Sequence, residues 1–227
     1  MGNVIEGNNI KRGFPTAGEM FWALKGISLS VGEGKLTIFK GRSGSGKTTL
    51  INILGALDLP TEGEVFFDGK SLSKVTELER DQLRRKSIGF VFQSIALVSM
   101  MTAYENVEFG LRISGFNIKE RRKRAETCLG LVGLSQRMGH LPQELSGGEC
   151  QRVAIARAIA HHPKVIFADE PTAELDTNTG LQVVKIFKDL VEREGVTVVM
   201  TTHDPGLMDI ADVVYELEDG ELSDGRR

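Results

Sequence analysis

Gly41-Arg42-Ser43-Gly44-Ser45-Gly46-Lys47-Thr48 is the stretch that decides the fold, because every position matches the phosphate-binding pattern G-x-x-x-x-G-K-[ST]. It lies between an apolar run, Leu36–Lys40, and a helical pattern, Lys47–Leu57, which is the strand–loop–helix context that the pattern requires. Glycines let successive backbone N–H groups face a phosphate, and the helix adds the positive end of its dipole. We expect Lys47 to contact the β- and γ-phosphates and Thr48 to offer its hydroxyl to Mg²⁺. These eight residues and Thr49 are therefore the candidate nucleotide contacts.

The composition is that of an ordinary folded protein. The chain has 227 residues, 41% of them apolar and 26% charged, which allows one large domain or one domain with an inserted subdomain. The net charge of −3 provides no overall positive field, so we expect no nucleic-acid partner. Cys128 and Cys150 lack a metal-binding spacing and suggest no disulfide framework, which favours a reducing, cytosolic compartment.

The sequence predicts that any link to a membrane depends on a partner. No apolar run reaches the roughly 18 to 20 residues that a membrane helix requires. The segment Met1–Gly13 is polar and glycine-rich and lacks the apolar core of a signal peptide.

Short β-branched runs alternate with helical patterns, which predicts an α/β domain with a largely parallel core sheet. The expected strands are Leu36–Lys40, Glu64–Phe67, Ile88–Val91, Val165–Ala168 and Val196–Thr201. Three further strands are expected as antiparallel additions: Ile27–Val31, Val213–Leu217 and Glu221–Leu222, the last two joined by a turn at Asp219-Gly220. The other expected helices are Asn178–Arg193 and Pro205–Ile210.

The segment from Ser94 to about Pro142 reads as a helical insertion, because it has helical patterns and no convincing strand. The two patterns are Ala103–Ile113 and Lys119–Leu131. The cluster Lys119-Glu-Arg-Arg-Lys-Arg124 is compatible with a nucleic-acid patch, but such clusters are more often the solvated face of an amphipathic helix. We favour the solvated face.

A pair of acids ends the apolar strand Val165–Ala168. In α/β sheets ligands bind at the carboxyl ends of the strands, so Asp169 is the candidate ligand of Mg²⁺. Because side chains alternate along a strand, Glu170 points away from the direction of Asp169, which makes it the candidate for polarising the attacking water. The alternative, a solvent-facing acid pair, becomes less attractive with a phosphate loop upstream.

Two more polar residues follow expected strands. Gln93 could bring an amide oxygen to the metal or the water, and His203 could contact the γ-phosphate. A lone Gln or His at a strand end is more often structural, so the functional roles proposed for both residues depend on the motifs above.

Leu145-Ser146-Gly147-Gly148-Glu149 is a second device for binding anions, because its glycine pair opens the helical pattern Cys150–Ala160. One phosphate loop is enough for a monomeric nucleotide hydrolase. The most economical use of a second device is to close over a nucleotide that another copy of the chain holds.

Taken together, these motifs resemble the ATP-binding subunit of ABC transporters. The resemblance covers nearly the whole chain and rests on the order of Gly41–Thr48, Gln93, Leu145–Glu149, Val165–Glu170, Glu174-Leu175-Asp176 and His203. It implies a P-loop ATPase core, an N-terminal antiparallel β subdomain and a helical subdomain at residues 94–145, all within one ABC ATPase domain spanning residues 1–227.

The resemblance also implies a dimer that holds two MgATP at its interface. Each ATP would lie between Gly41–Thr48 of one copy and the Ser146, Gly147, Gly148 and Glu149 region of the other. Asp176 would lie on the loop that joins the two sites, and Gln93 would couple them to an integral membrane permease docked near Ser94–Glu105. The chain would then be cytoplasmic, peripheral on the inner face of the membrane.

By the same resemblance, Phe14 stands where a tyrosine usually stacks on adenine, and a phenyl ring can also stack. The pair Phe21-Trp22 is the alternative, although packing is the commoner role for such a pair. The chain departs from the family pattern at three places. Cys150 stands where Gln is common just after the signature, and Glu174 adds an acid near the expected dimer interface. Ser94–Met101 lacks the Asn and Pro that usually follow the Gln.

Several segments are similar to the lipoprotein-release and macrolide-export group, among them Gly55–Glu64, Ile88–Gln93 and Thr102–Val107. This implies export or mechanical work driven through the membrane partner. Cell-division ATPases that signal to a cell-wall enzyme, and peptide-resistance pumps, are near alternatives. A soluble ABC-type protein acting on ribosomes or DNA is a weaker one, because such proteins usually carry two cassettes or a long coiled coil.

Overall fold

The computed structural model describes residues 2–16 and 18–223, so Met1, Ala17 and residues 224–227 of the expected 1–227 domain lie outside the description. Its core is a six-stranded sheet in the order β10-β9-β3-β8-β7-β6. The strands are β3 Leu36–Lys40, β6 Ile88–Val91, β7 Val165–Ala168, β8 Thr197–Thr202, β9 Val213–Glu218 and β10 Glu221–Ser223. All neighbours pair in parallel except β9 and β10. The predicted α/β class with a mainly parallel core is confirmed.

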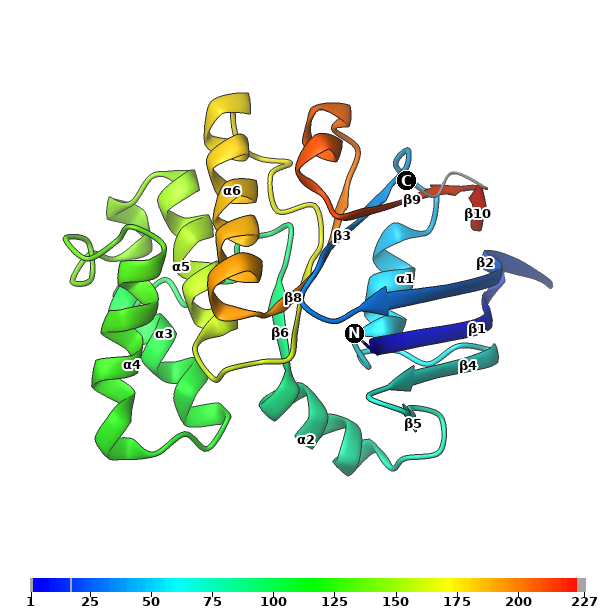
Figure 1. Ribbon diagram of the computed structural model, residues 1–227, viewed down its shortest axis with the longest axis horizontal. Coiled ribbons are helices and arrows are strands. Elements are labelled where there is room, and N and C mark those ends of the chain that lie inside the picture. The colour runs from blue at the N-terminus through cyan, green and yellow to red at the C-terminus, as the bar shows by residue number, and fades with distance from the viewer. Residues whose placement is uncertain (1, 17, 224–227) are drawn as a thin grey trace.

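A second, antiparallel sheet has the order β2-β1-β4-β5 and packs beside the core sheet (Figure 1). Its strands are β1 Asn3–Thr16, β2 Glu19–Gly32, β4 Glu62–Phe67 and β5 Lys70–Ser71. The predicted N-terminal antiparallel sheet is therefore confirmed. The polar, glycine-rich start of the chain hid β1 from the sequence analysis, because its alternation of buried and exposed positions is broken by several register shifts.

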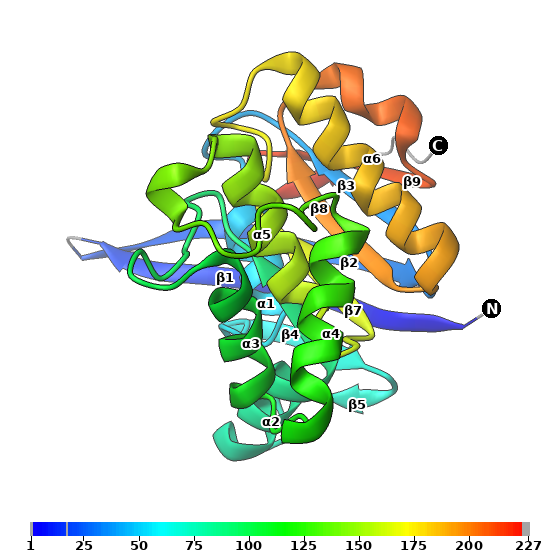
Figure 2. The ribbon, with the colours of Figure 1, turned by 90° about the vertical axis from the view of Figure 1, so that its left-hand side faces the viewer.

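The core sheet is buried on both faces by different partners. Ile38, Ile166 and Met200 face a cluster with α3 Ala103–Ile113, α4 Ile118–Leu131, α5 Gly147–Ile159 and α6 Thr177–Glu194. Phe39, Phe167 and Val199, on the opposite face, pack with α1 Lys47–Leu54 and the antiparallel sheet. Figure 1 shows the same layering, with α3, α4 and α5 gathered on one side of the molecule and α1 on the other, and Figure 2 views the molecule from the side of α3, α4 and α5.

Two expectations need correction. Ile27–Val31, within β2, and β10 are antiparallel as expected, but β9 is a parallel neighbour of β3, because the chain returns through a 3₁₀ helix, Pro205–Ile210, before β9 begins. The first helix ends at Leu54 rather than Leu57, since Gly55 caps it and a Cβ at Gly55 would lie 2.4 Å from Phe90.

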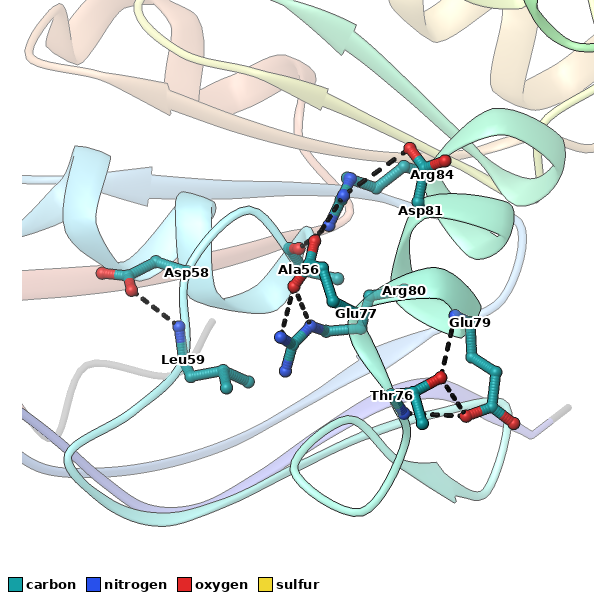
Figure 3. Close-up of polar contacts among 9 residues, drawn as sticks. All are labelled: Ala56, Asp58, Leu59, Thr76, Glu77, Glu79, Arg80, Asp81 and Arg84. Atoms are coloured by element: carbon teal, nitrogen blue, oxygen red, sulfur yellow. Dashed lines mark hydrogen bonds and ion pairs between the residues drawn. The ribbon is translucent and has the colours of Figure 1, made fainter.

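A helix that the sequence analysis missed, α2 Glu77–Ser87, follows β5 (Figure 3). The capping box between Thr76 and Glu79 begins it, and this S/T-x-x-E spacing was the available signal. Arg84 donates a hydrogen bond of 2.7 Å to the carbonyl of Ala56, and Glu77 pairs with Arg80 and Arg84. The bond from Arg84 attaches α2 to the segment just after α1, and the two Glu77 pairs stabilise α2 itself.

The expected helical insertion is present: α3, α4 and a short 3₁₀ helix, Pro142–Glu144, follow β6 without a strand in the part of the chain that the structure describes. None of the described helices is both long enough and apolar enough to cross a membrane.

Candidate nucleotide site

The loop Gly41–Lys47 wraps tightly between β3 and α1. Gly44 and Gly46 have positive φ angles of 82° and 104°, and a Cβ at Gly46 would lie 2.7 Å from the carbonyl oxygen of Ala23. A Cβ at Gly41 would lie only 2.2 Å from the carbonyl oxygen of Leu217. Only glycine fits these positions. No side chain of the described residues caps α1, so its first N–H groups remain available to bind an anion.

Lys47 brings a nearly buried charge into this loop. Its Nζ donates hydrogen bonds of 2.9 and 3.0 Å to the carbonyl oxygens of Gly41 and Arg42. It also pairs with Glu170 Oε1 at 3.2 Å, and only 4% of the Lys47 side chain is exposed. The other Glu170 oxygen, Oε2, lies 3.1 Å from His203 Nδ1. The fold thus joins three candidate residues from α1, the end of β7 and the end of β8.

Glu170 adopts an uncommon backbone conformation. Its φ angle is +43°, in the left-handed region that side chains with a Cβ rarely occupy. Such strain is characteristic of functional sites. It turns Glu170 away from the strand path, so that the carboxylate meets Lys47 and His203.

Asp169 has a different partner, which the sequence analysis missed. Thr201, fully buried on β8, donates a hydrogen bond of 2.6 Å from Oγ1 to Asp169 Oδ1. The same hydroxyl accepts a bond of 2.8 Å from the backbone N–H of Glu170. A threonine in an apolar strand carries no sequence signal for this role, since β-branched residues are ordinary there.

The signature Leu145–Glu149 forms the start of α5. Ser146 is the N-cap: its Oγ accepts from the Glu149 N–H at 3.2 Å, and Glu149 Oε2 accepts from the Ser146 N–H at 2.8 Å. This bond to the backbone of Ser146 is the main reason that the pKa of Glu149 is lowered. Ser146 and Gly147 are exposed at the surface, whereas Gly148 is buried.

Asp176 lies beside the signature. It caps α6, accepting from the Asn178 and Thr179 N–H groups and, at 2.6 Å, from the Thr179 hydroxyl, which is the main cause of its lowered pKa. Thr179 in turn packs on the signature, since a Cβ at Gly148 would lie 2.3 Å from its Cγ2. The structure therefore joins Gly148 and Asp176 in one cluster at the starts of α5 and α6.

The two anion-binding devices are not joined within one chain. Among residues 2–16 and 18–223, no hydrogen bond or ion pair links Leu145–Glu149 to Gly41–Thr49. α1 and α5 pack on opposite faces of the core sheet. Gln93 is exposed beyond β6 and makes no side-chain hydrogen bond in the described part of the chain.

Phe14 lies on β1 opposite Phe21 of β2, and it is 38% exposed. The guanidinium of Arg12 lies 4.8 Å from the centre of the Phe14 ring. Arg12 Nε is also 2.9 Å from Asp58 Oδ2, beyond the end of α1. Phe21 is more exposed, at 60%, and Trp22 is half-buried.

The basic cluster on α4 is partly used inside the fold. Arg124 donates hydrogen bonds to the carbonyls of Ile159 and Ala160 at the end of α5, and Arg121 donates to the carbonyl of Phe116. Arg122 pairs with Glu126 on its own helix. Arg121 and Arg124 are thus used inside the fold, whereas Arg122 lies on the solvent-exposed face of α4.

Residues 24–173 match the family model described as ABC transporter. An uncharacterised ABC transporter ATP-binding protein of Methanocaldococcus jannaschii is 45% identical, over 96% of this chain and 97% of that protein. The macrolide export ATP-binding/permease protein MacB of Wolinella succinogenes is 44% identical over 97% of this chain, which spans 34% of MacB. A dimeric structure of the cassette MJ0796 in a post-hydrolysis state with ADP and Pi has 40% identity and a TM-score of 0.89, covering 98% of this chain and 97% of that one. With this coverage, and with the phosphate loop, the acid pair and the signature on one scaffold, the chain belongs to the ATP-binding subunits of ABC transporters and is an ABC-type ATPase.

Proposed function

We propose that this ATPase dimerises around two MgATP and drives conformational work in a membrane partner. The observation that carries the proposal is the convergence of Lys47, Glu170 and His203 at the phosphate loop, while a second anion-binding helix start lies elsewhere. Within this proposal residues 1–227 act as one ABC ATPase domain, and residues 94–145 are its helical subdomain.

The phosphates of ATP would be bound by the backbone of the loop and by Lys47, with Phe14 stacked on the adenine. The loop N–H groups supply directional donors. The ammonium group of Lys47, which pairs with Glu170 here, can pair with the γ-phosphate instead. The proposed nucleotide contacts of one copy are Phe14, Gly41, Arg42, Ser43, Gly44, Ser45, Gly46, Lys47, Thr48, Thr49 and Gln93.

The donor set suits Mg²⁺. Thr48, Gln93 and Asp169 offer a hydroxyl, an amide and a carboxylate oxygen, which are the hard ligands that this ion prefers. Within the described residues, no three His, Cys, Asp or Glu side chains form a metal cage of their own. Mg²⁺ is commonly held by one or two carboxylates and the phosphates of the substrate, so one aspartate is sufficient. When bound, the ion neutralises charge on the transferring phosphoryl group.

Glu170 would act as the base for the attacking water. Its carboxylate is held between Lys47 and His203, and a base must lie within hydrogen-bond reach of the proton that it takes. His203, 60% exposed, would hold the carboxylate with one ring nitrogen and offer the other to the γ-phosphate. Lys47 and His203 would together stabilise the charge that develops on the phosphate.

The second copy would complete the site with its own Ser146, Gly147, Gly148 and Glu149, while Asp176 would lie on the loop between the two sites. Ser146 and Gly147 are exposed, as an interface requires, and the α5 start has backbone N–H groups and a positive dipole end to offer. The dimeric form of MJ0796 with ADP and Pi supports this arrangement.

A groove between the core and the helical insert is the proposed docking site of an integral membrane permease. Its volume is about 390 Å³, and α2 forms one rim. Phe92, Phe109 and Ile113 are partly exposed there, and Arg157, which also lines the groove, donates a hydrogen bond to the carbonyl of Ala96 in the expected docking segment Ser94–Glu105. Its position beside Gln93 would link the nucleotide site to the partner. The chain would thus work at the inner face of the membrane, and the relative named for macrolide export supports an export or mechanical output.

Glu170→Gln tests the proposed mechanism. The variant should bind ATP and form a stable ATP-bound dimer, with turnover reduced at least about a hundredfold, because the amide cannot accept the proton. Lys47→Ala should instead lose ATP binding. Sedimentation velocity with and without MgATP, together with phosphate release, separates the two outcomes. Unchanged turnover in Glu170→Gln would remove Glu170 from the mechanism.

A further inference from the structure

We propose that Thr201 is a positioning residue for hydrolysis, which ties the metal ligand Asp169 to the backbone of the base Glu170. The inference rests on the proposed roles of these two acids. It adds a residue on β8, the strand next to β7, that controls the geometry of both acids.

The contacts form a short chain of hydrogen bonds with a fixed direction. The Glu170 N–H donates to Thr201 Oγ1 at 2.8 Å, and the Thr201 hydroxyl donates to Asp169 Oδ1 at 2.6 Å. Thr201 is fully buried, so its single proton has no competing acceptor in solvent. Bonds in such a chain polarise one another, and the low local dielectric strengthens them.

The first link holds the strained backbone. Glu170 has a φ angle of +43°, a conformation that costs free energy and persists only when the surroundings enforce it. An N–H bond to a buried hydroxyl on the neighbouring strand is such a constraint. It keeps the Glu170 carboxylate facing Lys47 and His203, at 3.2 and 3.1 Å.

The second link orients the metal ligand. By accepting at Oδ1, Asp169 is fixed in one rotamer, and its Oδ2 makes no hydrogen bond or ion pair with residues 2–16 or 18–223. That oxygen is the one left for Mg²⁺. Partners that orient a metal ligand in this way typically change activity or metal affinity by about 10- to 100-fold when they are replaced.

The test compares Thr201→Val, which keeps the shape and removes the hydroxyl, with Thr201→Ser, which keeps the hydroxyl. Thr37→Val is the matched control: Thr37 is equally buried, lies on the adjacent strand β3, and its hydroxyl has no hydrogen-bond partner among residues 2–16 and 18–223. Two properties are measured for each variant. One is hydrogen exchange of the Glu170 amide without nucleotide, and the other is kcat and KM for MgATP with the Mg²⁺ concentration at half-maximal rate.

Thr201→Val should accelerate exchange of the Glu170 amide at least about tenfold, because its acceptor is lost. It should also lower kcat or raise the Mg²⁺ requirement by about 10- to 100-fold, with KM for MgATP changed less than about threefold. Thr201→Ser should restore both properties, and Thr37→Val should alter neither. If Thr201→Val does not fold, Thr201→Ala replaces it in the same comparison.

Wild-type kcat and Mg²⁺ dependence in Thr201→Val would overturn the proposal, as would equal losses in Thr201→Val and Thr37→Val. If Glu170 is not the base, the proposed function fails rather than the role of Thr201, and unchanged turnover in Glu170→Gln detects that case. Whether or not Glu170 is the base, exchange of its amide reports the hydrogen bond from the Glu170 N–H to Thr201 Oγ1.

Discussion

At the scale of single residues, Arg12 covers one face of the proposed adenine platform, Phe14. Arg12 lies over one face of the Phe14 ring and is tied to Asp58 by an ion pair. A cation over an aromatic ring is attracted to it, so a base that stacks on Phe14 would have to use the opposite face. Arg12 therefore positions Phe14 as well as covering it.

Replacing Phe14 by Ala should weaken ATP binding by about 1 to 3 kcal/mol, the usual contribution of base stacking. Arg12→Gln should weaken it by about 0.5 to 1 kcal/mol, because the ring loses its support. Inorganic tripolyphosphate, which has no base, should bind both variants as tightly as the wild type. Equilibrium titration with each ligand measures this difference.

Phe21→Ala is the control for the alternative platform, and it should leave ATP affinity unchanged. Loss of ATP affinity in Phe21→Ala but not in Phe14→Ala would transfer the stacking role to Phe21.

At the scale of elements, three helices begin with the same capping box: α2 at Thr76, α3 at Thr102 and α5 at Ser146. In each, the carboxylate at the third helical position accepts from the backbone N–H of the cap, and its pKa is lowered mainly by that bond. A lowered folded pKa means that the carboxylate stabilises the fold above its ordinary pKa. The contribution is lost as the pH falls through the folded value.

Glu149→Gln tests this linkage at the signature helix. At pH 7 the variant should have a smaller free energy of unfolding than the wild type, because the charge at the helix start is gone. The difference should shrink as the pH falls below 4.5, the ordinary pKa of a glutamate, where the wild-type carboxylate is progressively protonated. Urea unfolding across this range measures it, and a difference that stays constant would contradict the linkage.

Ser146→Ala removes the cap itself and should cost about 1 kcal/mol of the free energy of unfolding without nucleotide. Ser99→Ala, at an exposed turn, is the control and should fall within about 0.5 kcal/mol of the wild type. Urea unfolding of the two variants under one condition provides the comparison. Equal stability of both would argue against the observed cap.

The proposed docking groove beside α3 can be tested by substitutions that place a charge in it. Phe109→Glu or Ile113→Glu would place a charge on the proposed docking surface, and co-purification with an integral membrane subunit should be lost while basal turnover remains. Leu78→Glu is the matched control, since Leu78 is 73% exposed on α2 and does not line the groove. Retention of the subunit in all three variants would rule out this surface.

At the scale of the whole molecule, the core sheet separates the phosphate loop from the signature. α1 and α5 bury opposite faces of the same strands, so the two anion-binding devices belong to different layers. The proposed composite site takes one of these devices from each of two copies. Turnover should therefore rise more than linearly with protein concentration.

Two inactive variants should complement each other. Lys47→Ala destroys the phosphate loop and Ser146→Arg blocks the signature, so each alone should be inactive, although Ser146→Arg should still bind ATP. In a mixture, half of the randomly formed dimers contain one intact composite site out of two, which restores about a quarter of the wild-type activity. Phosphate release from the mixture measures this recovery, and no recovery at any ratio would argue against a site shared between copies.

The sequence alone determined the class of fold, the phosphate loop, the acid pair and the signature, because these depend on local spacing: glycines where the backbone must turn, apolar runs that end in charges, and caps that begin helices. The tertiary structure decided which side chains meet. Glu170 pairs with Lys47 and His203 only because its backbone is left-handed, and Thr201 reaches both acids only because β7 and β8 are neighbours. β1 and the parallel direction of β9 also emerged only from pairing, since strand order and register depend on contacts between distant segments that no local pattern encodes.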